Sequence, residues 1–333
     1  MSAEFEQKKN PITLTRLLLS DSKEMGASGD FVILLQSIQL AIKVIASATA
    51  KAGISNLYGI SGTQTANSSG DVQKTLDVLA NDIFVNSLSF CNQVKIMGSE
   101  ECEEPYILHT KGKYAVSFDP LDGSSVISSN GPTGSIFGVS RALDIDGSAN
   151  PCASLLKAGR DLVAAGYALY GPSTMLILAT SRGVNSFTLD PTIGEFILTE
   201  SNIKIPSKYP IYSINEGNSL HFDAPTAKYI QQCKEQSFRA RYIGSMVGDV
   251  HRTLVCGGIF GYPGDKKSPK GKLRLLYEVA PMSFIIEKAG GKATTGTGSP
   301  LDVVPTSLHE RCPIWLGSTE MVNEIEQLYK ELQ

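Results

Sequence analysis

Hydrophobic positions repeat at helical spacing in two segments near the start of the chain. Residues 31–49 place one stripe along a helix that Gly53 ends: Phe31, Leu34, Leu35, Ile38, Ile42, Ile45 and Thr49. A second helix is predicted over residues 72–88, with these inward positions: Leu76, Leu79, Ile83 and Leu88. The intervening residues 56–70, NLYGISGTQTANSSG, are small, polar and without periodicity, so we expect a mobile loop there.

Short runs of β-branched and aromatic residues replace this pattern from residue 106 onward. The runs YILH, YAVSFD, SIFGVSRAL, LVAAGYALYG and TMLILAT predict strands, and FTLDPTIGEFIL is typical of a hairpin around residues 191–195. After residue 200, the strand-like runs IYSI, GGIFGY and IWLG alternate with predicted helices near residues 223–234, 246–256, 277–289 and 319–331. This alternation predicts an α/β layered sandwich with mixed sheets.

The length of the chain adds a question of domains. A chain of 333 residues exceeds what one hydrophobic core usually organises, so we expect two domains or one large layered domain. No internal repeat and no shift in composition marks a linker. We place the boundary near residue 200, with an N-terminal domain over residues 1–200 and a C-terminal domain over residues 201–333.

Charge and cysteine content exclude several classes of protein. With 30 basic and 33 acidic residues, the chain gives no reason to expect nucleic acid or an anionic membrane as a partner. The six cysteines have no CxxC spacing, which indicates reduced thiols rather than a disulfide framework. No signal-peptide pattern and no apolar run of the roughly 18 residues that a membrane span needs are apparent. We therefore expect a soluble, cytoplasmic protein.

The stretch FDPLDGSS carries the strongest chemical signal. Asp119 and Asp122 follow a predicted strand, where open α/β sheets place their ligands. Two partly buried carboxylates this close need a compensating cation, and hard oxygen ligands suit Mg²⁺ or Mn²⁺ better than zinc. The following amides suit an anion such as phosphate: Gly123, Ser124 and Ser125. The alternative is a plain turn that caps a helix.

Further carboxylates stand where an acidic side chain is unexpected. Asp77 adjoins the apolar stripe of the second predicted helix, and Glu278 follows the apolar run RLLY. Glu100 and Glu101 lie in a polar loop before a predicted strand. Taken singly, each is more often a surface charge or a helix cap.

Several motifs together resemble one family. GDVQKTLDVLAND, SEE, FDPLDGSS, YSINEG, RYIGSMVGDVHRTL, GGIFGYP and KLRLLYE, in this order, are similar to the fructose-1,6-bisphosphatases of the lithium-sensitive phosphatase fold, over residues 14–317. The DPxDGS element is shared with inositol monophosphatases, whereas YSINEG and GSMVGDVHRTL are specific to the bisphosphatases. The resemblance implies an αβαβα sandwich, a Mg²⁺-dependent hydrolase and a gluconeogenic step on fructose 1,6-bisphosphate.

The resemblance also implies roles for the carboxylates. Two or three Mg²⁺ ions, or Mn²⁺, would be held by one set: Asp71, Glu100, Asp119, the Leu121 carbonyl, Asp122 and Glu278. Asp77 and Glu101 would polarise the water that attacks the 1-phosphate. Asp71 and Arg274 resemble a pair that completes a metal position when the loop closes.

The second half of the chain would then bind the sugar. The implied substrate set is Asp122, Gly123, Ser124, Ser125, Asn215, Arg241, Tyr242, Gly244, Ser245, Met246, Tyr262, Lys272 and Arg274. Arg241 would reach the site of a neighbouring subunit in a homotetramer. Asn218 departs from the family pattern, which has a tyrosine at this position.

A regulatory AMP site is implied as well. Its residues would be Ser28, Gly29, Asp30, Lys113, Tyr114 and Arg141. A helix N-terminus with Lys and Arg beside it suits a phosphate. The family's threonine is Val32 here, and an ordinary helix cap remains an alternative.

Two other functions stay open at this point. One keeps the chemistry and changes the substrate, as in a sedoheptulose-1,7-bisphosphatase or an inositol-type monophosphatase. The other is a sugar-phosphate sensor without turnover, against which Asp77 and Glu101 argue, since a pure binder has no use for acids that activate water.

Overall fold

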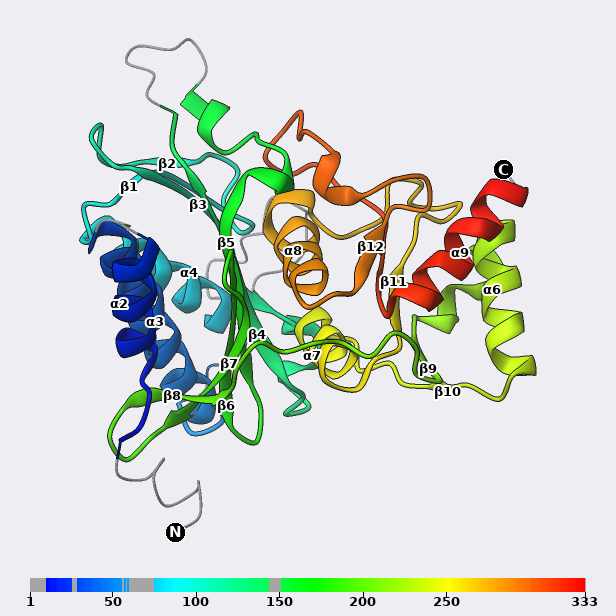
Figure 1. Ribbon diagram of the computed structural model, residues 1–333, viewed down its shortest axis with the longest axis horizontal. Helices are drawn as coiled ribbons and strands as arrows, with labels where there is room; N and C mark the ends of the chain where they lie inside the picture. The colour runs from blue at the N-terminus through cyan, green and yellow to red at the C-terminus, as the bar shows by residue number, and fades with distance from the viewer. Residues whose placement is uncertain are drawn as a thin grey trace.

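Two sheets run through the part of the chain that the structure describes, with helices between them and on both outer faces (Figure 1). The structure is a computed structural model, and it describes residues 10–25, 29–55, 57, 59, 75–143 and 151–332. From left to right in Figure 1 the layers are helices, the larger sheet, helices, the smaller sheet and helices. The predicted αβαβα sandwich is confirmed.

The larger sheet has eight strands in the order β2-β1-β3-β4-β5-β6-β7-β8. Their bounds are β1 Val94–Ser99, β2 Tyr106–Ile107, β3 Tyr114–Asp122, β4 Thr133–Arg141, β5 Leu162–Tyr170, β6 Thr174–Thr180, β7 Gly183–Asp190 and β8 Glu195–Glu200. Only β1 and β3 pair in parallel; the other neighbours are antiparallel. The predicted hairpin is confirmed as β7 and β8, in which Asp190 pairs with Glu195.

Helices α2 (Leu14–Met25), α3 (Gly29–Ala50) and α4 (Thr75–Ser89) cover one face of this sheet. The α3 prediction is confirmed. On α4 the inward stripe differs from the prediction, because Leu79 and Ile83 are only half-buried while Ala80 and Phe84 are fully buried. The Phe84 ring stacks on Phe118 of β3, with the centroids 4.8 Å apart. This contact fixes α4 beside the strand that carries FDPLDGSS.

The length and hydropathy of α3 alone would allow it to cross a membrane. The sequence pattern predicted no segment of this kind. The helix carries few charges, and its inner side belongs to the core beneath the sheet: Val32, Leu34, Leu35, Ile38, Ala41, Ile42, Ile45 and Ala46 are buried. Packing against the sheet accounts for an apolar helix of this length.

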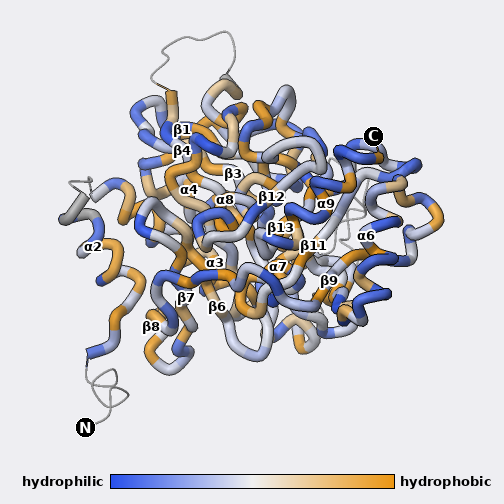
Figure 2. Tube along the Cα trace, turned by 45° about the vertical axis from the view of Figure 1, so that its right-hand side comes forward, coloured by the Kyte–Doolittle hydropathy of each residue, from blue (hydrophilic) through white to orange (hydrophobic). Residues whose placement is uncertain are grey.

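The middle layer contains α7 (Met246–Cys256) and α8 (Ala280–Lys288). A π-helical turn, η4 (Leu275–Val279), leads directly into α8. Both helices contact both sheets, and the apolar segments, orange in Figure 2, run through the middle of the molecule. The predicted domain division at residue 200 stays a prediction.

The smaller sheet has five strands in the order β10-β9-β11-β13-β12. Their bounds are β9 Ile211–Ser213, β10 Arg239–Ala240, β11 Ile259–Tyr262, β12 Lys292–Thr294 and β13 Ile314–Gly317. Helices α6 (Ala224–Glu235) and α9 (Thr319–Leu332) form the outer layer. The short helices are α5 Ser124–Ile127, η1 Pro151–Ser154, η2 Gly159–Asp161, η3 Glu216–His221 and η5 Pro300–Asp302.

Sequence patterns missed α2, β1, β10 and β12. The predicted loop of residues 56–70 lies outside the described residues, apart from 57 and 59.

Candidate active site

Three carboxylates from two distant parts of the chain meet between the sheets. One oxygen each from Asp119, Asp122 and Glu278 lies within 4.8 Å of the other two. Asp119 is 2% exposed and Glu278 is 6% exposed. The structure therefore brings together three of the predicted metal ligands.

Strand β3 and the turn after it position the two aspartates. The Leu121 amide donates to Asp119 Oδ1 at 2.9 Å, which folds the turn back onto its first carboxylate. The Pro120 carbonyl accepts from the Ser135 hydroxyl of β4 at 2.7 Å. Gly123 has a φ of +85°, and a Cβ there would lie 2.9 Å from Ser245. Both the backbone conformation and the close approach of α7 therefore require glycine after Asp122.

The π-helical turn η4 aims Glu278 at the aspartates. The Arg274 amide donates to Glu278 Oε2 at 2.5 Å, and the Leu276 carbonyl accepts from Ser117 Oγ of β3 at 3.0 Å. Arg274 itself is 3% exposed, so its charge lies beside the carboxylates rather than in water. These bonds join the second half of the chain to the strand that ends in Asp119.

The cluster is electrostatically unfavourable without a cation. Burial raises the pKa of Asp119 well above its usual range, and Glu100, Asp122 and Glu278 raise it further. Burial likewise raises the pKa of Glu278, with Glu100 adding to the effect. Buried oxygens of this kind suit a hard divalent cation, so the donor set fits magnesium or manganese.

Asp122 differs from the other two because it is bound to the start of α7. Burial raises its pKa, while donors from α7 lower it. Ser245 Oγ and the Val247 amide both donate to Asp122 Oδ2 at 2.8 Å, and the Met246 amide donates to Oδ1 at 3.3 Å. These bonds keep Asp122 ionised more readily than Asp119.

Glu100 and Glu101 lie at the same edge as Asp119. Ser99 pairs with Phe118 in the parallel β1–β3 ladder, so the carboxyl ends of both strands meet there. The Glu100 amide donates to the Phe118 carbonyl at 3.1 Å. Both carboxylates also act on the pKa of Asp119, which places them close to it. The missed strand β1 is therefore the element that brings these two acids to the site.

Asp77 occupies a buried position on α4, with 3% exposed. One turn later, Asn81 Oδ1 accepts from Ser99 Oγ at 2.7 Å, and Ser99 Oγ accepts from the Glu101 amide at 3.3 Å. This chain of bonds ties the helix of Asp77 to the turn of Glu101. Asp71, the remaining predicted ligand, lies outside the described residues.

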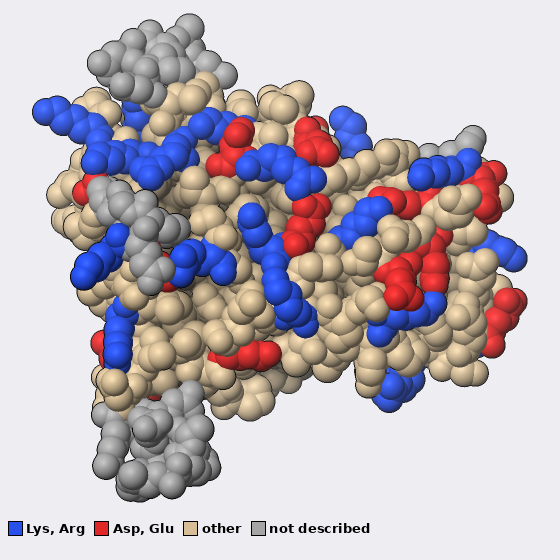
Figure 3. Space-filling model, viewed as in Figure 1, with Lys and Arg blue, Asp and Glu red and all other residues tan. Residues whose placement is uncertain are grey.

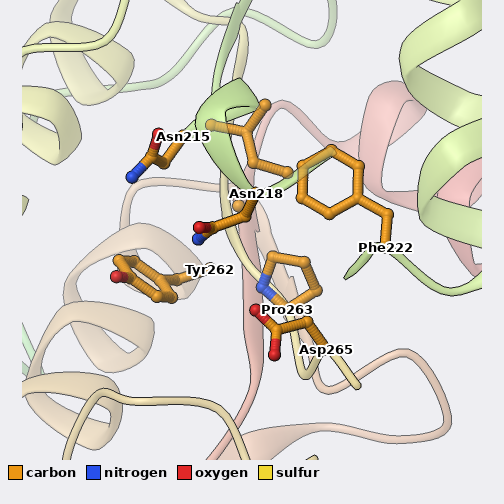
Figure 4. A pocket seen from close by; sticks show the side chains of 8 residues that line it. Asn215, Asn218, Phe222, Tyr262, Pro263 and Asp265 are labelled. Carbon is orange, nitrogen blue, oxygen red and sulfur yellow. The ribbon is translucent and has the colours of Figure 1, made fainter. Parts of the chain in front are cut away.

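A small, open pocket lies in the second half of the chain, beside β11 and η3. It is lined by Ile214, Asn215, Asn218, Phe222, Gly261, Tyr262, Pro263 and Asp265. In Figure 4 the amides of Asn215 and Asn218 and the Tyr262 phenol point to the same side. Three polar groups that converge in this way can hold the oxygens of an anion.

Other residues predicted for the sugar lie around this pocket. Partial burial, with Tyr262 nearby, raises the pKa of the half-exposed Tyr242 to about 12. Lys272 is exposed. The Ser268 and Lys267 amides outweigh burial and lower the pKa of Asp265, a lining residue, and Lys272 adds a smaller lowering. Arg241 is exposed, and its guanidinium donates to the Ala240 carbonyl at 2.8 Å. Its reach into a neighbouring subunit stays a prediction. Gly123 lies against Ser245, and Ser124 and Ser125 begin α5. Ser245 and Met246 donate to Asp122, whereas the Gly244 amide donates to Asp249.

The residues predicted for a nucleotide gather at the opposite end of β3. Lys113 and Asp30 form an ion pair, and the Arg141 guanidinium lies 4.8 Å above the Tyr114 ring. Gly29 begins α3 beside them, while Ser28 lies outside the described residues. On the face drawn in Figure 3, basic side chains gather over this end of the larger sheet, near β1, β2 and β3.

Val32, which stands where the family pattern has a threonine, faces the core. It is 4% exposed and packs in the core beneath the sheet. A hydroxyl at this position would enter apolar surroundings.

Sequence reasoning missed Asp249, a fully buried carboxylate of α7. An acid within the apolar helix face 246–254 was the signal that could have identified it. It also missed Asn81 and Ser99, for which only a polar residue beside a buried stripe gave a hint.

Comparison with known proteins gives consistent matches over nearly the whole chain. Residues 12–201 match the sequence profile described as fructose-1-6-bisphosphatase, N-terminal domain, and residues 205–330 match the C-terminal domain profile. The chain is 51% identical to a cytosolic fructose-1,6-bisphosphatase of Arabidopsis thaliana, over 96% of this chain and 95% of that protein. It is 50% identical to the cytosolic protein of Spinacia oleracea, over 96% and 94%. A crystal structure of Leishmania major fructose-1,6-bisphosphatase in holo form superposes with a TM-score of 0.91 at 44% identity, covering 96% of this chain and 99% of that one.

Proposed function

The chain belongs to the fructose-1,6-bisphosphatase family, and we propose that it hydrolyses the 1-phosphate of fructose 1,6-bisphosphate to fructose 6-phosphate and phosphate. It is then a phosphoric monoester hydrolase that acts in gluconeogenesis. The buried cluster of Asp119, Asp122 and Glu278 is the single observation that carries the chemistry. Such a cluster needs cations, and cations beside an anion pocket are what phosphate transfer requires.

Two or three Mg²⁺ ions per subunit, or Mn²⁺, would be held by Asp71, Glu100, Asp119, the Leu121 carbonyl, Asp122 and Glu278. The chemistry that bound ions supply here is neutralisation of the phosphoryl oxygens and a lower pKa of the attacking water. Glu101 and Asp77 would polarise that water for its attack on the 1-phosphate. Their turn and helix are held together through Ser99 and Asn81, which supports a shared role.

The distal phosphate and the sugar ring bind in the pocket of Asn215, Asn218 and Tyr262, with Tyr242 and Lys272 beside it. Asn218 still donates through its amide, but it reaches less far than the tyrosine of the family pattern. Arg241 would complete this subsite from the neighbouring subunit of a homotetramer.

AMP is the proposed allosteric inhibitor. Gly29, Asp30, Lys113, Tyr114 and Arg141 offer helix amides, two cations and an aromatic face. This arrangement supports a nucleotide site away from the carboxylate cluster. Ser28 belongs to the same proposal.

We also propose that the protein works in the cytosol. The plant relatives that it resembles are named as cytosolic, and all six cysteines are free thiols. Free thiols fit a reducing compartment.

Phosphate release tests the function and separates it from the alternatives. Fructose 1,6-bisphosphate, sedoheptulose 1,7-bisphosphate and inositol 1-phosphate are compared at equal concentration, with and without Mg²⁺. The proposal expects the highest kcat/KM for fructose 1,6-bisphosphate and no release after chelation. Preference for either other substrate identifies that phosphatase instead, and binding without release identifies a sensor.

A further inference from the structure

The segment of residues 241–247 leads from β10 into the first turn of α7 and carries two of the residues proposed to bind the sugar phosphate, Arg241 and Tyr242. Its second half is fixed to the metal cluster, because Ser245, Met246 and Val247 all donate to Asp122. Its first half has a different anchor. That anchor is Asp249, which none of the assigned sites includes.

Asp249 is fully buried and collects four donors from three elements. Ser213 Oγ of β9 donates to Oδ1 at 2.8 Å, and the Arg252 guanidinium donates to the same oxygen at 2.9 Å. The Ile243 amide donates to both carboxylate oxygens, at 3.1 and 3.0 Å, and the Gly244 amide donates to Oδ2 at 3.1 Å. A carboxylate at 0% exposure is stable only when donors such as these bind its oxygens. Because all four partners donate, this position requires a carboxylate.

We propose that Asp249 is a positioning residue for the sugar-phosphate subsite. It fixes the backbone at Ile243 and Gly244 and thereby aims Arg241 and Tyr242. The inference rests on the proposed function, since it deepens the assignment of that subsite. It concerns binding of the phosphate that does not react.

The backbone geometry explains why the aim of these side chains depends on one carboxylate. Gly244 has a φ of +90°, and the hydrogen bond from its backbone N–H to Asp249 holds this conformation in place. Tyr242 is 41% exposed, so core packing alone does not fix it. The Arg241 amide donates to the Tyr212 carbonyl at 2.9 Å, and Tyr212 adjoins Ser213, another partner of Asp249. Loss of the Asp249 carboxylate should therefore loosen the backbone at Ile243 and Gly244, next to Arg241 and Tyr242.

Asparagine cannot replace Asp249 in this role. An amide has one acceptor oxygen, and its NH₂ group would face N–H donors of the segment. The Asp122 end of the segment stays clamped in such a variant. Binding of the sugar phosphate by Arg241 and Tyr242 should therefore weaken. The residues bound to Asp122 should keep their geometry.

The test compares Asp249→Asn with the unchanged protein and with Asp223→Asn as a matched control. Asp223 caps α6, where it accepts from the Thr226 amide and the Tyr329 hydroxyl, both at 2.9 Å, away from this segment. We expect Asp249→Asn to raise KM for fructose 1,6-bisphosphate about tenfold or more, with kcat within about twofold. The inhibition constant of fructose 6-phosphate should rise by a similar factor, and that of inorganic phosphate should not. Asp223→Asn should change none of these by more than about twofold.

A merely structural role gives a different result, in which kcat falls with the active fraction while KM stays the same. That result, or equal weakening of inorganic phosphate and fructose 6-phosphate, overturns the inference. Should Asp249→Asn not fold, Ser213→Ala removes one donor and keeps the carboxylate; it should raise KM about two- to fivefold. An unchanged KM in a folded Ser213→Ala protein overturns the inference too.

Failure of the proposed function can be distinguished from failure of this inference. If the unchanged protein releases no phosphate, titration calorimetry with fructose 6-phosphate replaces the kinetic readout. Weaker binding in Asp249→Asn than in Asp223→Asn supports the inference, and equal binding rejects it.

Discussion

The hydroxyl of Ser245 donates to Asp122 Oδ2 at 2.8 Å, which joins a carboxylate of the metal loop to the first residue before α7. The two residues are far apart in the chain, yet each contributes to the position of the other. Ser245 caps α7 by accepting from the Gly248 amide at 3.4 Å, and Asp122 offers its charge to the same helix end. The metal centre is thus built on the N-terminus of a helix from the other half of the chain.

Ser245→Ala should therefore affect both metal binding and stability. We expect the Mg²⁺ concentration for half-maximal activity to rise several-fold, and the free energy of unfolding to fall by about 1 kcal/mol. Mg²⁺ titration and denaturant unfolding measure the two effects. Ser299→Ala is the matched control, because Ser299 caps η5 by accepting from Leu301 and its hydroxyl donates to Glu287, outside the cluster of Asp119, Asp122 and Glu278. An equal Mg²⁺ dependence in the two variants would contradict the role of Ser245.

Asp119→Ala and Glu101→Gln should separate metal binding from water activation. Both are expected to lower kcat by orders of magnitude. Asp119→Ala removes a buried ligand, so Mg²⁺ binding should weaken. Glu101→Gln keeps the shape of the side chain and should leave more of that binding intact. Calorimetric Mg²⁺ titrations of the two variants check this difference. Superimposable titration curves would contradict the assignment of Asp119 as a metal ligand and Glu101 as a water-activating acid.

AMP should inhibit without competing with the sugar bisphosphate, and Arg141→Met should weaken this inhibition about tenfold or more. Arg141 lies over Tyr114 and supplies one of the cations for the nucleotide phosphate. Inhibitory concentrations are compared after each variant is scaled to its own uninhibited rate. Arg160→Met is the control, because Arg160 pairs with Glu287 and Asp302 instead. If millimolar AMP has no effect on the unchanged protein, Asp30 and Lys113 form only a surface ion pair.

Stability should fall in mildly acidic solution because of His251. Burial lowers the pKa of His251 from its ordinary value of 6.5, and Nδ1 lies 2.9 Å from the Tyr167 hydroxyl. The folded state thus resists protonation that the unfolded state accepts. The contribution of His251 is complete above pH 6.5 and is lost as the pH falls toward the lower folded pKa. Unfolding free energies between pH 7.5 and 5.5 should decline, and less steeply in His251→Gln. Identical slopes would show that His251 is not responsible.

Most of the layered fold follows from the sequence, because α3, β5, β6 and α7 have strong helical or strand-like periodicity. Short elements were missed where the pattern is weak. The sequence VKIMGS of β1 has glycine and lysine among its apolar residues, and β10 and β12 are only two and three residues long. The edge of β1 and β3, where Glu100 meets Asp119, therefore could not be derived from the pattern alone.

For the site, two close carboxylates after a strand in FDPLDGSS suggested cation chemistry, but a plain turn that caps a helix fitted the same residues until Asp77, Glu100, Glu101 and Glu278 were added. Asp249 gave only the weaker signal of an acid on the apolar face of α7. Its role depends on donors from residues 213, 243, 244 and 252, which only the folded chain brings together. Glu278 needed the family resemblance for its role, since the π-helical turn that aims it has no recognisable sequence pattern.

Phosphorus NMR of the reaction with fructose 1,6-bisphosphate is the most direct test of the central claim, that a carboxylate-bound metal centre removes the 1-phosphate. With Mg²⁺ the account predicts fructose 6-phosphate and inorganic phosphate as the products, and no reaction after chelation or in Asp119→Ala. Formation of fructose 1-phosphate, or phosphate release that persists in the chelated protein, would contradict it.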